Sequence, residues 1–347
     1  MPQRINFVDW LKSVGMFLIV FGHVVGPPFN QFTQPIYPKQ LGVALFIFVM
    51  GWSLANEERP RWRVAFNRLF PVYLFGIGSA VLLSGIVFLA QRDLNPSNYL
   101  PFMMGINVFL NYFPANPTTW YIGTYVHVIL IWCFFLQGRN VPFCGLGLAL
   151  VVEIGLRAAI MYTGYNYTAY MILPNWATVF LLGMYLRDRG DLDGKAALSL
   201  LAPLWFLSLF VWATVFNPYN LDKSFPFRDF PGEATVFSLL ARSGMISFLY
   251  LFHVLLLFQI FRRIQANGVV RFFSRNTLLI FILHMPFLYA FHSWVYRVIP
   301  MVWLKKSVMI LLMYGGIGLF SEVVLRIVKP NRLRERVWEK GSALFEQ

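Results

Sequence analysis

Charged residues and cysteines are both scarce in this sequence. Only 13% of the 347 residues are charged, 58% are hydrophobic, and the mean hydropathy is +0.60. This composition excludes an ordinary soluble domain and indicates a protein that crosses a membrane many times. The two cysteines, Cys133 and Cys144, lie in or beside apolar runs, which argues against a disulfide framework and against a cysteine-based metal site.

The sequence also lacks the motifs of several enzyme classes. It has no Gly-x-Ser-x-Gly turn, no phosphate-binding loop and no His-Glu-x-x-His pair. The net charge of +14 does not require a nucleic-acid partner, because membrane proteins accumulate Lys and Arg in their cytoplasmic loops. Histidine, carboxylate and arginine inside a membrane remain for chemistry, and we expect no metal and no resident cofactor.

Ten apolar segments are long enough to cross a bilayer, which takes about 20 residues. They comprise residues 7–25, 40–56, 69–90, 120–137, 141–162, 170–186, 197–217, 236–261, 276–297 and 304–326. We therefore expect an all-α, polytopic bundle of about ten transmembrane helices in the cell inner (plasma) membrane. The apolar stretch 99–113 is short and interrupted by polar residues, so we predict a re-entrant or interfacial segment there.

The distribution of basic residues predicts the orientation. Of the 29 lysines and arginines, Arg157 and Arg242 lie in the interior of the segments. The others lie in the connections or near segment ends, twenty on the side of the N-terminus and seven on the opposite side. The seven are Lys39, Arg92, Lys223, Arg228, Arg297, Lys305 and Lys306. Both termini are therefore predicted to be cytoplasmic. Residues 1–330 form the membrane domain, and residues 331–347 a basic tail expected to anchor at the membrane surface.

The first segment carries an acid, a base and a histidine, which are Asp9, Lys12 and His23. Eleven residues separate Lys12 from His23, so a helix places them on one face about 16 Å apart. Ionisable groups in membrane helices usually face the bundle interior and are candidates for function. The alternative for Asp9 and Lys12 is an interfacial ion pair at the end of the helix.

Ionisable residues recur in later segments. Glu153 and Arg157 have the i, i+4 spacing of an intrahelical ion pair, which either neutralises itself or contacts a substrate. Arg242 and His253 repeat the eleven-residue spacing of the first segment. His284 lies near the middle of the ninth segment, just before a proline that frees a backbone carbonyl.

These residue types suit a particular kind of donor. Histidine is a suitable general base because its pKa lies near operating pH, and a neighbouring carboxylate or carbonyl can fix its tautomer. Arginine binds polyphosphates through its planar fork. Acyl-CoA, a thioester with a nucleotide at its other end, needs both.

Several stretches carry a resemblance to a known family. They are Arg4–Lys12 with Phe21–Val24, Phe46–Trp52, Arg68–Tyr73, Trp120–Ile122 and Ser274–Pro286. Over roughly residues 4–330 they resemble the motifs of the integral membrane acyltransferase-3 family, especially its fucose 4-O-acetylase-like branch. Lys12 stands where most members have arginine. Ala65 and Tyr125 stand where the family often has arginine and glutamate, with Arg63 near the first of these positions.

The resemblance implies transfer of an acyl group, most often acetyl, from cytoplasmic acyl-CoA to a hydroxyl of a carbohydrate or a lipid-linked glycan. His23 is then the expected base for the acceptor hydroxyl, or a transient acyl carrier. Asp9 and His284 are further candidates for catalysis. The cations expected to hold the CoA phosphates are Lys12, Arg63 and Arg68.

Candidates for acceptor binding are less specific. They are Trp120, Tyr121, Glu153, Arg157, Arg242 and His253. The two aromatic residues can stack on sugar faces, but Trp and Tyr also populate membrane interfaces. The competing interpretation is a transporter or flippase for a glycolipid or polysaccharide, in which the same charges line a path and no bond is made. A scaffold in a polysaccharide assembly complex is the third alternative.

Overall fold

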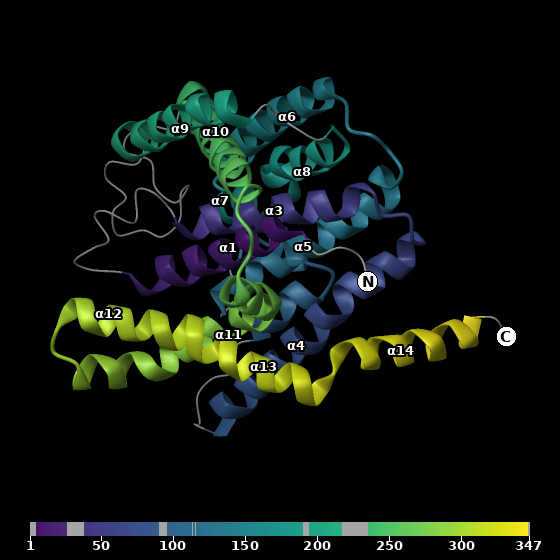
Figure 1. Ribbon diagram of the computed structural model, residues 1–347, viewed down its shortest axis with the longest axis vertical. Coiled ribbons are helices and arrows are strands. Elements are labelled where there is room, and N and C mark those ends of the chain that lie inside the picture. Colours follow the sequence, from purple (N-terminus) through teal and green to yellow (C-terminus); the bar gives the residue numbers. More distant parts are fainter. Residues whose placement is uncertain are drawn as a thin grey trace.

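The structure is a computed structural model that describes residues 5–25, 38–89, 96–112, 114, 116–189, 194–216 and 235–345. Within these ranges the chain forms ten apolar helical stretches, each matching one predicted segment (Figure 1). Eight of them are long and apolar enough to cross a membrane. The prediction of a polytopic helical bundle is therefore confirmed. Outside the described residues lie Arg4, Arg92, Lys223 and Arg228, which the predictions above name, and Phe113, the last residue of the predicted 99–113 segment.

The ten stretches follow one another in the order of the predicted segments. They are α1 (Asn6–Val24), α3 (Pro38–Ala55), α4 (Arg61–Leu89), α5 (Trp120–Ile131) with the π-helical turn η4 (Trp132–Leu136), α6 (Phe143–Tyr162), α8 (Ala177–Arg189), α9 (Gly194–Val211) with the π-helical turn η6 (Trp212–Phe216), α10 (Val236–Phe261), α11 (Gly268–Val298), and α12 (Val302–Ile310) continued through the π-helical turn η7 (Leu311–Gly316) into α13 (Ile317–Val328). A further helix, α14 (Pro330–Phe345), follows them.

The two shorter stretches, α3 and α8, pack in the interior. α3 lies between α1 and α8. A Cβ atom added at Gly42 would collide with the carbonyl oxygen of Gly15 in α1, and one added at Gly51 with the carbonyl oxygen of Phe180 in α8. Small residues at such crossings let membrane helices approach to backbone contact. α3 and α8 are therefore the inner layer around which the longer helices pack.

Two helices begin earlier than the hydropathy predicts. α4 begins at Arg61 and α11 at Gly268, in both cases eight residues before the predicted segment. Arginines interrupt both of these early stretches, so an apolar window begins too late. The start of α11 is capped by Asn267, whose side-chain oxygen accepts a hydrogen bond from Val270 N at 2.9 Å. The extra turns of α4 place Arg63 and Arg68 on a helix instead of in a loop.

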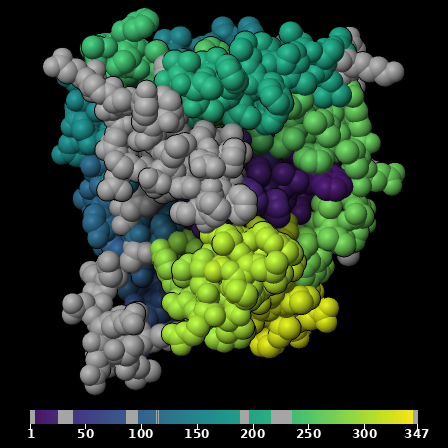
Figure 2. Space-filling view, turned by 90° about the vertical axis from the view of Figure 1, so that its left-hand side faces the viewer, coloured from purple at the N-terminus to yellow at the C-terminus, as the bar shows by residue number. Residues whose placement is uncertain are grey.

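Hydrogen bonds between helix ends and the segments that connect helices show which of these segments lie at the same end of the bundle. At one end, which we call the basic end, the start of α1 bonds to the α10–α11 connection, and Gln137 donates to the carbonyl of Arg59 at 2.8 Å. Helix α1 begins and helix α14 ends at this end (Figure 1). At the opposite end, seen in Figure 2, Lys306 Nζ donates to Val24 O at 3.1 Å. This alternation fits the predicted topology, in which the basic end is cytoplasmic.

Between α4 and α5, the described residues form short 3₁₀ helices instead of a continuous helix. Two of these, η1 (Pro96–Phe102) and η2 (Ile106–Val108), are separated by a short link that contains Gly105 at a φ of 72°. His127 of α5 donates through Nε2 to the carbonyl of Met104 at 2.9 Å. His127 therefore holds this segment against α5.

The last stretch is widened by its π-helical turn, η7. Tyr314 in this turn donates its hydroxyl to the carbonyl of Ser13 in α1 at 2.9 Å and stacks on Phe273 of α11 at 3.9 Å between ring centroids. Beyond the turn, Glu322 of α13 accepts a hydrogen bond from Arg275 of α11 at 2.7 Å. Together these contacts fix α12–α13 against the first and ninth membrane helices.

Candidate functional site

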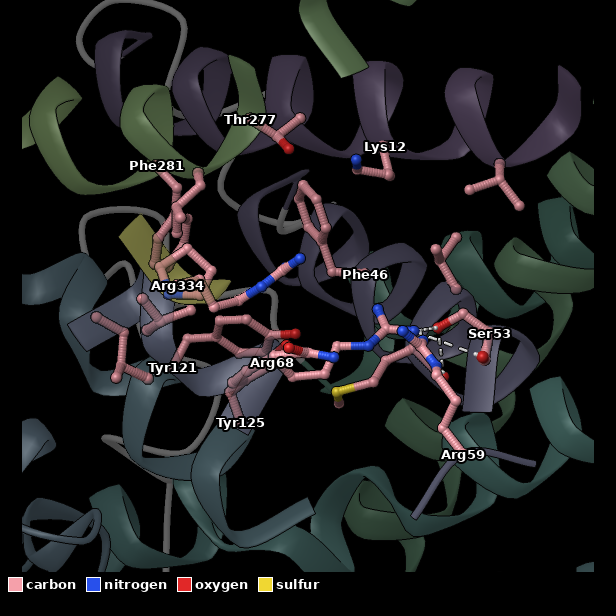
Figure 3. A pocket seen from close by; sticks show the side chains of 18 residues that line it. Lys12, Phe46, Ser53, Arg59, Arg68, Tyr121, Tyr125, Thr277, Phe281 and Arg334 are labelled. Carbon is pink, nitrogen blue, oxygen red and sulfur yellow. Dashed lines mark hydrogen bonds between the residues drawn. The ribbon is translucent and has the colours of Figure 1, made fainter. Parts of the chain in front are cut away.

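A cavity of about 530 Å³ opens at the basic end of the bundle. Its walls come from α1, α3, α4, α5, α11 and α14, which are far apart in the sequence (Figure 3). Most of the motif segments named above contribute residues to these walls. His23 and His284 are not among the lining residues. The cavity is therefore the natural place to compare the predicted site residues with the structure.

Cations from four segments line the cavity: Lys12 of α1, Arg59 of the α3–α4 connection, Arg68 of α4 and Arg334 of α14. Arg68 donates to Ser53 Oγ at 3.0 Å, a neutral partner. Arg59 makes a two-pronged pair with Glu57, with Nε to Oε1 at 2.8 Å and Nη2 to Oε2 at 2.6 Å. This hydrogen-bonded guanidinium holds the pKa of the Glu57 carboxyl below its ordinary value.

Aromatic side chains form another wall of the cavity. Tyr121 and Tyr125, one helical turn apart on α5, both line it. Phe281 of α11 meets Tyr121 edge to face at 5.6 Å between ring centroids. Trp120 points elsewhere because consecutive helical side chains diverge by about 100°. It is buried and packs on Tyr170 at 4.6 Å. Of the two aromatic candidates, only Tyr121 reaches the cavity.

Two histidines meet further along the helices that line the cavity. α1 is unbroken from Asn6 to Val24, so Lys12 and His23 share one helix as predicted. The His23 ring lies 5.2 Å from the ring of His284 on α11, centroid to centroid. His284 is three residues beyond Phe281, a cavity-lining residue of the same helix. The structure therefore brings together the two histidines that the sequence singled out.

The tautomer of His284 follows from its hydrogen bonds. Its Nδ1 lies 3.0 Å from the carbonyl oxygens of both Ile280 and Phe281. Carbonyls only accept, so Nδ1 carries the proton and Nε2 of the neutral ring keeps a lone pair. The ring is fully buried, and among the described residues Nε2 has no hydrogen-bond partner. His284 is therefore prepared to accept a hydrogen bond.

The backbone around His284 is held from outside its own helix. Pro286 has no N–H, so the carbonyl of Ile282 loses its helical partner. Asn116 fills that position, donating through Nδ2 to Ile282 O at 3.0 Å. Thr118, in the short 3₁₀ helix η3 (Pro117–Thr119), donates to Phe281 O at 3.2 Å. The proline that the sequence indicated is thus a docking point for the segment before α5.

Asp9 lies at the basic end, apart from the histidines. It is buried and accepts a hydrogen bond from Ser274 Oγ of α11 at 2.6 Å. Fourteen residues separate it from His23, which corresponds to about 21 Å along a helix. Its observed contact ties α1 to α11 beside the cavity.

Arg63 is not among the residues that line the cavity. It forms an ion pair with Glu335 of α14, and its guanidinium lies 4.6 Å from the centre of the Trp338 ring. Of the three cations predicted to bind the donor, Lys12 and Arg68 line the cavity, while Arg63 joins α4 to α14.

Glu153 and Arg157 form a buried cluster at the α6–α10 contact. Arg157 donates to Glu153 Oε1 at 2.7 Å and to Ser247 Oγ at 2.8 Å. Ser247 Oγ in turn donates to the same Glu153 oxygen at 2.5 Å, and Thr178 N donates to Oε2 at 3.0 Å. Arg157 also donates to the carbonyl of Ser243 at 2.6 Å. These partners join α6, α8 and α10.

Arg242 and His253 both lie buried on α10, and neither is among the residues that line the cavity. The His253 ring lies 6.2 Å from Trp205 of α9, and among the described residues neither of its ring nitrogens has a hydrogen-bond partner. Although the pair has the same eleven-residue spacing as Lys12 and His23, it therefore does not contribute to the cavity that Lys12 lines.

The cavity also contains residues that the sequence reasoning did not select, which are Ser53, Arg59, Tyr125 and Arg334. Tyr125 follows Tyr121 by four residues, so the helical period was the signal that pointed to it. The indication from the sequence that Arg334 reaches the cavity is weaker. It sits beside the single acid in the basic run Arg332–Arg336, a pattern that suggests a partnered helix as well as a surface anchor.

Comparison with known proteins assigns the chain to a protein family. The profile of the acyltransferase domain family matches residues 5–325. Searches of curated proteins and of solved structures yield no match. The matched range begins at α1 and ends within α13, so it includes every cavity wall except α14.

Proposed function

The chain belongs to the integral membrane acyltransferase-3 family, and from that premise we propose that it is an O-acetyltransferase. In this proposal the donor is acetyl-CoA, and the acceptor is a hydroxyl of a cell-surface or exported carbohydrate, or of a lipid-linked glycan. The protein is a multi-pass membrane acyltransferase, and we assign it to the inner membrane.

One observation carries the proposal: the same two helices, α1 and α11, contribute residues both to the cation-lined cavity and to the histidine pair. Lys12 and His23 lie on α1, while Thr277 of the cavity wall and His284 lie on α11. The separation of about 16 Å between Lys12 and His23 suits a donor whose phosphates stay at the basic end while its thioester reaches inward. The lysine and arginines that line the cavity at the basic end suit the binding of phosphates.

The chemistry needs one base. His23 accepts the proton of the acceptor hydroxyl as its oxygen attacks the acetyl carbon. The carbon–sulfur bond of the thioester breaks, a carbon–oxygen ester bond forms, and the proton passes to the departing CoA thiolate. His284 Nε2 keeps a lone pair, and its ring lies 5.2 Å from the His23 ring between centroids. In the proposed reaction this nitrogen accepts a hydrogen bond from the His23 ring and so selects the tautomer in which the other His23 nitrogen is the base. A covalent acetyl-His23 intermediate is the alternative route.

The acceptor is proposed to be a sugar for two reasons. The family-like motifs of this chain, including the lysine at position 12, resemble those of the fucose 4-O-acetylase-like branch. Tyr121 and Tyr125 provide aromatic faces in the cavity wall, which suit the apolar faces of sugars.

Acetyl transfer by the purified full chain in nanodiscs tests the proposal, with radiolabelled acetyl-CoA and a panel of glycans. We expect labelled glycan from the wild type. The variant His23→Ala should lower kcat about a thousandfold, within the range typical of a lost general base. The matched control is His292→Ala, an exposed histidine further along α11, which should stay within about twofold of the wild type.

The outcomes separate the alternatives. Wild-type activity in a correctly folded His23→Ala variant would remove His23 from the mechanism. Label found on the wild-type protein after rapid quenching, and lost in His23→Ala, would favour the acyl carrier over the general base. Transport without bond chemistry predicts no labelled product from any glycan.

A further inference from the structure

We propose that α14, the helix beyond the matched family domain, completes the donor-binding mouth, with Arg334 binding a phosphate of acyl-CoA. This inference rests on the acyl-CoA donor proposed above. It assigns a binding residue to a part of the chain that the sequence alone predicts to be a surface anchor.

The position of Arg334 is the first support. It lines the same cavity as Lys12 and Arg68, although the three residues come from α14, α1 and α4. In Figure 3 its side chain reaches in from the yellow C-terminal helix, on the opposite side of the cavity from Ser53. Together with Lys12, Arg59 and Arg68, this arginine adds positive charge where a polyphosphate would enter.

The second support is a set of contacts that fixes how α14 sits on α4. Glu335 forms an ion pair with Arg63 of α4, and its other oxygen accepts from Arg334 Nη2 at 3.0 Å. The Trp338 ring lies 5.2 Å from that of Phe66 on α4, and the Arg63 guanidinium lies over the same indole. Glu335 and Trp338 therefore act as positioning residues for Arg334.

The direction of α14 is set at Lys329, between α13 and α14. This residue has a φ of 47°, in the left-handed region that non-glycine residues seldom adopt. The chain thus bends between α13 and α14 (Figure 1). Beyond the bend, α14 contacts α4 at the basic end, where the cavity opens.

The local charge balance suits a phosphate. One carboxylate, Glu335, is shared between two guanidinium groups, Arg63 and Arg334, so this group of three keeps one positive charge. A guanidinium has five N–H donors in a planar fork, so Arg334 can bond Glu335 and a phosphate oxygen together. The ligand chemistry is therefore that of a nucleotide polyphosphate, and the acetyl group is not involved.

Calorimetric binding of CoA to the full chain in nanodiscs tests this inference. Arg334→Ala should weaken CoA binding about tenfold or more, as expected for a lost charge-assisted contact. Arg336→Ala is the matched control, because it removes an exposed arginine from the same helix, and it should bind CoA within about twofold of the wild type. Pantetheine, which has the thiol arm without phosphates, should bind equally to both variants and to the wild type.

The positioning role has its own test. Trp338→Ala should weaken CoA binding about threefold to fivefold, and Trp338→Phe, which keeps a ring against Phe66, should restore most of it. Wild-type CoA affinity in a folded Arg334→Ala variant would overturn the inference and leave the acetyltransferase proposal intact. Equal weakening by Arg334→Ala and Arg336→Ala would also overturn it, since only general charge would then matter. Absence of CoA binding to the wild type would overturn both proposals.

Discussion

Two of the charged groups described above differ in what surrounds their side chains. In the α6 cluster, the Arg157 and Glu153 side chains are 0% and 1% exposed, and serines and backbone groups of α8 and α10 surround them. At the basic end, Lys12 and Arg68 line an open cavity, where Arg68 bonds to the neutral Ser53. One group is enclosed by the protein, while the other faces a space that a ligand can fill.

The difference separates a structural role from a binding role. A buried ion pair stabilises a fold only when hydrogen bonds offset the loss of water from both charges. The α6 cluster meets this condition through its own neighbours. Cations at a cavity keep their attraction for an anion that arrives from outside. We therefore expect substitutions in the first group to change stability and substitutions in the second to change donor affinity.

The largest effect is expected from Arg157→Ala. It leaves Glu153 buried without its cation, which costs about 3–5 kcal/mol in comparable buried pairs. Thermal unfolding of the purified protein should show a strong decrease in Tm and a lower yield of folded material. The double variant Glu153→Leu/Arg157→Met removes both charges and should recover most of the loss. An unchanged Tm in Arg157→Ala would end the distinction drawn here.

A smaller effect, confined to the ligand, is expected from Arg68→Ala. Loss of this guanidinium should weaken CoA binding about tenfold to a hundredfold, the range of a charge-assisted hydrogen bond. Tm should stay near that of the wild type because Ser53, its partner, is uncharged. Arg263→Ala, an exposed arginine at the same end, serves as the control. A large decrease in Tm with unchanged affinity would move Arg68 into the structural group.

The smallest effect is expected from Lys12→Arg. An arginine offers a planar, two-pronged contact to a phosphate, whereas lysine offers a point charge. The substitution should therefore strengthen CoA binding by about threefold without altering Tm. Weaker binding would indicate that the cavity requires the compact ammonium group.

Local features of the site were accessible from the sequence. The helical period alone placed Lys12 and His23 on one face, and α1 is continuous across both. The i, i+4 spacing likewise predicted the ion pair of Glu153 with Arg157. Each of these relations depends on residues within a few turns of one helix, so no knowledge of the tertiary structure is needed to find them.

Relations between distant segments were not accessible in the same way. The partner of Arg63 is Glu335, 272 residues away, and no pattern along the chain connects them. The contribution of Arg334 depends on the turn at Lys329 and on the packing of Trp338 against α4. Hydropathy also places the start of α4 too late, because arginines interrupt its first turns. In each case the deciding contact arises only after the helices have packed.

The π-helical turn η7 allows the last membrane stretch to lose one residue at that place without a change of register. Such a turn holds one residue more than an α-helical turn would, and each residue of an α-helix rotates the chain by about 100°. Deleting a single residue between Leu311 and Gly316 would therefore let the turn close into a regular α-helical turn, with α13 still facing α11 and Glu322 still beside Arg275. The same deletion within α13 itself would instead rotate all the residues beyond it by about 100°.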